Sequence, residues 1–149
     1  MNRVPRTPFV LVIACALAAC SGTEVGRVPL TGEGAGETIA DLKAGQVDFW
    51  MDIHLEYDGD AALQYRVDLL QDGVAVATTT CNPLGAIHVK GDHWTATNVG
   101  DKHTRRGSGK MSCSLDLARG GRTTVKTALA FSKRPATLTF DKADLVVRQ

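Results

Sequence analysis

The residues of this chain that could support metal-assisted hydrolysis are histidines close in sequence to carboxylates. His88 and His93 lie close together with Asp92 between them, His103 follows ten residues later, and His54 lies far upstream. A zinc site needs three or four converging ligands, and these spacings match no established ligand motif. We therefore predict no metal, no cofactor and no catalytic site. A metal-assisted hydrolase using His88, His93 and Asp92 is the alternative function.

A second candidate for chemistry is the stretch RGSGKMS at 106–112, which superficially resembles a phosphate-binding loop. Thr104 stands where that motif has its first glycine, and Met111 replaces the motif's Ser or Thr. The residues that follow have the alternation of a strand, whereas the motif opens a helix. The chain also lacks the G-x-S-x-G pattern of a serine nucleophile. These observations favour a protein that is not an enzyme.

The segment DKHTRRGSGK at 101–110 is the most strongly basic part of the surface that the sequence predicts. Lys102, Arg105, Arg106 and Lys110 fall within it together with two glycines, so we expect a mobile loop that presents cations. Guanidinium groups pair with phosphate or carboxylate oxygens two at a time. The four residues are therefore candidate anion-binding residues, and the alternative is a solvated loop paired with acidic neighbours.

Charge is divided unevenly along the chain, although the formal net charge is only +1. Residues 20–72 carry 3 basic and 11 acidic side chains, and residues 73–149 carry 12 basic and 5 acidic ones. Two halves that neutralise each other in one fold would explain this pattern, and a basic face for an anionic partner is the alternative. Nothing outside the segment at 101–110 indicates a basic surface interleaved with aromatic residues, and the domain as a whole is near neutral, which argues against nucleic acid.

The first 20 residues have the composition of an export signal. Arg3 and Arg6 precede eleven apolar residues at 9–19, a run too short for a permanent membrane span. The sequence LAAC at 17–20 resembles the lipobox of bacterial lipoproteins, a resemblance limited to this leader and Cys20. It implies cleavage before Cys20, diacylation of its thiol and acylation of the new amine. Ser21 after the cysteine implies the outer membrane in that family.

Two alternatives to this reading of the leader concern the cleavage point. One is ordinary secretion with cleavage after Ala18, and the other is use of Cys15, which has a poorer lipobox before it. Once Cys15 belongs to the leader and Cys20 to the anchor, Cys81 and Cys113 are left inside the domain. Export leads to an oxidising compartment, so we predict a disulfide between them. Two separate buried thiols are the alternative.

The elements that position these residues are predicted to be strands. Apolar residues alternate with polar ones at 46–57, at 62–71 and again from Met111 to Leu117, and Asp72-Gly73 is a hairpin signal. Trp50 breaks the polar side of its strand, so it either meets a loop or lies exposed. Weaker strands are predicted at 86–90 and 94–98. Short strands without a helical period favour an all-β antiparallel two-sheet β-sandwich of seven or eight strands.

The predicted organisation is a signal peptide at 1–19, a lipidated Cys20 with a flexible Gly-rich tether through residue 36, and a β-sandwich at 37–149. Together these features predict an outer-envelope lipoprotein with a non-catalytic binding, adhesion or assembly module. Its expected partners are the membrane, through the lipid anchor, and anionic glycan, lipopolysaccharide or an envelope protein.

Overall fold

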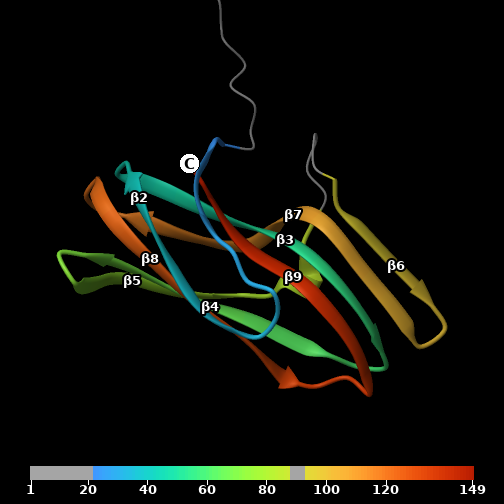
Figure 1. The fold of residues 1–149 in the computed structure, drawn as a ribbon. Coiled ribbons are helices and arrows are strands. Elements are labelled where there is room, and N and C mark those ends of the chain that lie inside the picture. The colour runs from blue at the N-terminus through green and yellow to red at the C-terminus, as the bar shows by residue number, and fades with distance from the viewer. Residues whose placement is uncertain (1–21, 88–92) are drawn as a thin grey trace, which may run out of the picture.

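Two antiparallel β-sheets packed against each other form the protein, in a computed structural model that describes residues 22–87 and 93–149. One sheet has the order β1-β9-β3-β7-β6 and the other the order β2-β8-β4-β5 (Figure 1). This confirms the predicted sandwich, and the described residues form nine strands where seven or eight were expected. The strands are β1 (Glu24–Val28), β2 (Gly34–Leu42), β3 (Gly45–Asp58), β4 (Ala62–Gln71), β5 (Val74–Cys81), β6 (Thr95–Val99), β7 (Lys102–Leu117), β8 (Gly121–Lys133) and β9 (Thr137–Arg148).

The core lies between the sheets and is built from the alternating apolar positions that the sequence displays. On β3 the residues from Val47 to Tyr57 at odd positions are all buried, and those of β4 from Leu63 to Leu69 meet them from the other sheet. Tyr65 of β4 is buried, and its hydroxyl donates a hydrogen bond of 2.7 Å to the carbonyl oxygen of Ala143 on β9. That bond satisfies a polar group inside an otherwise apolar interior.

Regular structure begins closer to the N-terminus than the sequence predicts. The expectation of a flexible tether through residue 36 is therefore wrong. β1 pairs with β9 along the edge of the five-stranded sheet, and β2 begins at Gly34. Glycines suggested flexibility here, but they permit close packing: a Cβ on Gly36 would lie 2.7 Å from Val28 Cγ1. The backbones of Thr23 and Gln149 exchange two hydrogen bonds of 2.9 and 3.0 Å. Residues 1–19 and Cys20 lie outside the described residues.

The basic segment at 101–110 is also not a loop, which corrects a second prediction. A two-residue turn at Gly100 and Asp101 joins β6 to β7, and β7 then runs without interruption from Lys102. Gly107 and Gly109 lie inside this strand and face the interior, opposite Ile53 and Met51 of β3.

Those two glycines make room for the chain at residues 93–94, which crosses the inner face of β7. A Cβ on Gly107 would overlap the carbonyl oxygen of His93, and one on Gly109 would lie 3.1 Å from the Trp94 ring. Trp94 is buried and fills the core beside Met51. Close approach, and not flexibility, therefore explains why glycine stands at both positions.

The connections differ in how well the sequence predicted them. Asp72 and Gly73 have φ angles of 52° and 79°, as the predicted hairpin requires. The strand predicted at 94–98 is β6, with all five residues exposed. Of the strand predicted at 86–90, Ile87 makes an isolated bridge to Lys110 and residues 88–90 lie outside the described part.

In residues 22–87 and 93–149 there is no helix long and apolar enough to cross a membrane.

A disulfide joins Cys81, at the end of β5, to Cys113 on β7, as predicted from the sequence. The two Cα atoms are 5.4 Å apart. The bridge links the two sheets at the side of the sandwich where β5 faces β7, and it closes a separation of 32 residues that includes β6.

Replacing Gly107 by alanine should lower the free energy of unfolding by about 3 to 5 kcal/mol, because the added Cβ meets backbone and φ is 99°. Gly100→Ala is the matched control, since its φ is 60° but nothing lies within 4 Å of the added Cβ. That control should lose about 1 to 2 kcal/mol. Urea unfolding of the two variants provides the measurement, and equal losses would contradict the close approach at Gly107.

Removing the disulfide with the double substitution Cys81→Ser and Cys113→Ser should cost about 3 to 4 kcal/mol, because the unfolded chain regains the freedom of the closed loop. Unfolding of the oxidised protein with and without a reductant gives an independent value. Peptide mapping under non-reducing conditions that finds both thiols free would overturn the assignment.

Candidate binding surface on the five-stranded sheet

The four candidate anion-binding residues do not converge in the structure. All four lie on β7, but Arg105 points into the end of the sandwich whereas Arg106 points out from the sheet. Neighbouring residues of a strand face opposite ways, so a continuous strand separates the two guanidinium groups. The predicted mobile loop, which would present the cations together, is therefore wrong.

Arg105 stabilises the β6–β7 hairpin from its buried side. Its Nη1 donates hydrogen bonds to Thr97 O at 3.1 Å, to Asn98 Oδ1 at 2.9 Å and to Thr104 O at 3.0 Å. Its guanidinium carbon lies 5.8 Å from the centroid of the Tyr57 ring. Because Nη1 is engaged within the hairpin and only 9% of the residue is exposed, Arg105 has a structural role. Its Nε is buried without a hydrogen-bond partner among the described residues.

The other cations of the segment differ in their partners. Lys102 Nζ lies 3.7 Å from Glu56 Oε2, and Lys110 Nζ lies 2.7 Å from Asp48 Oδ2. Both acidic partners belong to β3. Arg106 is exposed and forms no ion pair or hydrogen bond with the residues that the structure describes. It is therefore the one member of the predicted set whose donors are free within that part of the chain.

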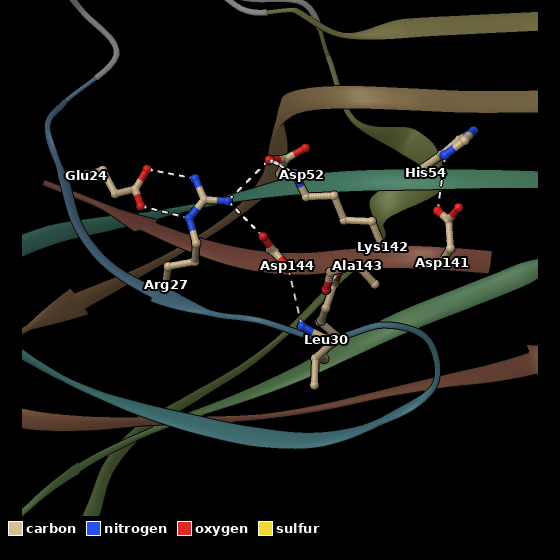
Figure 2. A network of polar contacts seen from close by, with 10 residues as sticks. Glu24, Arg27, Leu30, Asp52, His54, Asp141, Lys142, Ala143 and Asp144 are labelled. Carbon is tan, nitrogen blue, oxygen red and sulfur yellow. Dashed lines mark hydrogen bonds and ion pairs between the residues drawn. The ribbon is translucent and has the colours of Figure 1, made fainter.

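A network of charged side chains covers the outer face of the same sheet near β1 (Figure 2). Arg27 of β1 binds both carboxylate oxygens of Glu24 at 2.9 Å, and its Nη1 reaches Asp52 of β3 at 3.2 Å and Asp144 of β9 at 2.9 Å. Asp52 also accepts a hydrogen bond of 2.6 Å from Lys142. One guanidinium thus ties the edge strand β1 to its neighbour β9 and, beyond it, to β3.

These contacts change the proton affinities of the groups in the network. The hydrogen bonds from Arg27 lower the pKa of the Glu24 carboxyl, and the bonds that Arg27 makes to Glu24 raise the pKa of its own guanidinium. Burial raises the pKa of the Tyr65 hydroxyl, and the charges of Asp144 and Asp52 add to that effect. Glu24 and Arg27 are thereby held as an ion pair, and Tyr65 as a neutral donor.

Next to this network, Arg106, His54 and Lys142 form a row across β7, β3 and β9. His54 pairs in register with Arg106 on one side and with Lys142 on the other. Asp141 occupies a β-bulge and places its Oδ1 3.1 Å from His54 Nδ1 (Figure 2). The row borders a surface hollow of about 230 Å³, which the three side chains line together with both aspartates.

Trp50 does not lie exposed as a contact residue. It is 1% exposed, and the guanidinium carbon of Arg148 lies 4.1 Å from the centroid of its ring. The guanidinium of Arg148 stacks on the Trp50 indole and covers it, although this residue breaks the polar side of its strand. Within the described residues, Trp50 Nε1 is buried without a hydrogen-bond partner.

The residues of the alternative hydrolase site are only partly described. His88 and Asp92 lie outside the described residues, and His93 is exposed. His103 stacks on Tyr57 with ring centroids 4.8 Å apart. Among residues 22–87 and 93–149, no three His, Cys, Asp or Glu side chains converge as metal ligands would.

Sequence reasoning missed Arg27, Lys142 and Asp144 of the outer-face network, and Asp141 beside His54. No motif marks them, because their proximity depends on β9 lying between β1 and β3. The uneven division of charge was the available signal. A scan against models of known families finds none that matches the chain, and a search of curated proteins finds no similar sequence.

Substituting Arg27 by glutamine should lower the free energy of unfolding by about 1 to 2 kcal/mol at neutral pH, a value reduced for its partial exposure. The pKa of Glu24 is lowered in the fold, so its contribution is present above the carboxyl's ordinary pKa and is lost as pH falls through the lowered value. Denaturant unfolding should therefore show a smaller difference between variant and parent in acid. Arg66→Gln on the other sheet, whose Nε lies 3.3 Å from Asp68, is the control and should cost no more than about 0.5 kcal/mol. A difference that stays constant with pH would contradict this account.

Proposed function

We propose that this chain is a lipid-anchored protein of the bacterial cell envelope whose β-sandwich acts as a non-catalytic binding or assembly module. The observation that carries the proposal is the disulfide between Cys81 and Cys113 in a domain that follows a lipobox-like leader. Disulfides persist in oxidising compartments outside the cytosol, which is where such a leader directs a protein. The leader and the domain thus point to the same compartment.

The short link between Cys20 and the domain gives the anchor a geometric consequence. Backbone pairing begins at Thr23, which is bonded to Gln149. Three residues span at most about 10 Å, so acyl chains on Cys20 would hold this end of the sandwich close to the headgroups. The side chain of Gln149 also bonds both backbone groups of Lys43, at 2.7 Å each, which fixes the neighbouring turn.

A module held this way would bind its partner with the faces and the opposite end of the sandwich. The outer face of the five-stranded sheet is rich in charged side chains, and it contains Arg106 without an ion-pair partner among the described residues. Envelope surfaces offer phosphate and carboxylate groups that suit a guanidinium. An anionic glycan, lipopolysaccharide or an acidic envelope protein is therefore the proposed class of partner.

Cys20→Ala should move the protein from the membrane fraction to the soluble fraction, because stable attachment needs more than one acyl chain and Cys20 is the residue that would receive them. Cys15→Ala is the matched control and should leave the protein in the membrane fraction. Mass spectrometry of the parent protein should show an acylated N-terminal Cys20. An unmodified N-terminus at Ala19 or Ser21 would refute the anchor.

A further inference from the structure

We propose that the row of Arg106, His54 and Lys142 binds the phosphate group of a water-borne ligand, such as a sugar phosphate. The inference gives a ligand class to the binding module and rests on that proposed function. It differs from the arrangement predicted from the sequence, because two of these residues come from outside the basic segment. Each of the strands β7, β3 and β9 contributes one basic side chain to the row.

The first argument is the alignment of the three side chains at one level of the sheet. His54 is paired in register with Arg106 and with Lys142, so all three project from the same face of adjacent strands. Directly paired residues of antiparallel strands have Cα atoms about 4.5 to 5.5 Å apart. A tetrahedral oxyanion can therefore contact two neighbouring side chains of the row at once.

The second argument is which donors are already engaged. Asp141 lies 3.1 Å from Nδ1 of His54, and Asp52 accepts the 2.6 Å bond from Lys142 while also lying 3.2 Å from Arg27. These carboxylates orient the imidazole and the ammonium and leave Nε2 of His54 without a partner in the described part of the chain. With Nδ1–H directed at Asp141, Nε2 donates a hydrogen bond to a phosphate oxygen when the ring is the protonated imidazolium. Arg106 keeps its full guanidinium fork there, which is the geometry that binds two phosphate oxygens together.

The third argument is shape. The hollow of about 230 Å³ is bordered by all three basic side chains and by Asp52 and Asp141. The hollow is smaller than the pockets of about 300 to 1,000 Å³ that enclose whole ligands, so we expect it to hold one phosphate with only part of an attached sugar. The two carboxylates disfavour a polyanion lying flat across the row, because it would meet like charge on either side, and they leave a position for a single anionic group beside Arg106.

The position of the row along β3 selects a water-borne ligand over the headgroups of the anchoring membrane. Asp48 pairs with Arg148 at the end of the sandwich that would face the membrane, and His54 lies six residues further along β3. At about 3.3 Å per residue the row is about 20 Å from that end. This exceeds the Debye length of about 8 Å at physiological ionic strength.

The test is a nuclear magnetic resonance titration of the protein as cells process it, purified in a neutral detergent, with glucose 1-phosphate. Saturable shifts should appear at the amides of Arg106, His54 and Lys142, and uncharged glucose should produce none. Arg106→Gln should weaken the apparent affinity about tenfold and His54→Gln by a smaller factor. Arg122→Gln is the control, being an exposed arginine without an ion pair in the described residues, and should leave the affinity within about twofold.

Three results would overturn the proposal: no saturable shifts, affinity that Arg106→Gln leaves unchanged, or binding to phosphatidylglycerol vesicles without binding to glucose 1-phosphate. The last would assign the site to lipid headgroups. The lipid anchor and the phosphate site are tested by independent results. An unlipidated protein that binds glucose 1-phosphate removes the anchor and keeps this site, whereas a lipidated protein that does not bind keeps the anchor and removes the site.

Discussion

The strict alternation of side chains along β3 is the constraint on which the rest of the structure depends. The strand lies in the middle of the five-stranded sheet, with β9 on one side and β7 on the other. Its inward positions, from Val47 to Tyr57, supply a central part of the core, and its outward positions include Asp48, Asp52 and Glu56. A shift of one residue in its pairing would bury these carboxylates and expose the apolar row, so the register of the whole sheet is fixed by this strand.

The same strand explains how the uneven charge of the chain is balanced. The acidic β3 is flanked by two strands from the basic half, and cross-strand pairs of opposite charge stabilise a sheet. β2 and β8 repeat the arrangement in the other sheet. Ion pairs that join the acidic half to the basic half include Asp48–Lys110, Asp52–Lys142, Glu56–Lys102, Glu37–Lys126 and Asp60–Lys133. Neutralisation within one fold, the first of the two explanations offered by the sequence, accounts for most of the asymmetry.

How much the sequence predicted depended on whether the signal was local. Alternation at 46–57, the Asp72-Gly73 turn and the leftover cysteines predicted strands, hairpin and disulfide correctly. The glycine-rich segments were misinterpreted, because composition does not distinguish a flexible loop from a strand where another backbone approaches closely, as at Gly107. The row at His54 escaped prediction for a different reason: it requires knowing that β9 pairs with β3.

The place of β9 between β1 and β3 also governs when the protein can fold. Glu24 pairs with Arg148, so the first and last strands of the described chain are neighbours, and the contacts that close the five-stranded sheet span nearly its whole length. Contacts so distant in sequence close slowly, and they cannot form before residue 148 has been synthesised. The five-stranded sheet therefore closes only when its last strand has been inserted between β1 and β3. Under the export that we propose, this delay leaves the chain time to cross the membrane before it folds.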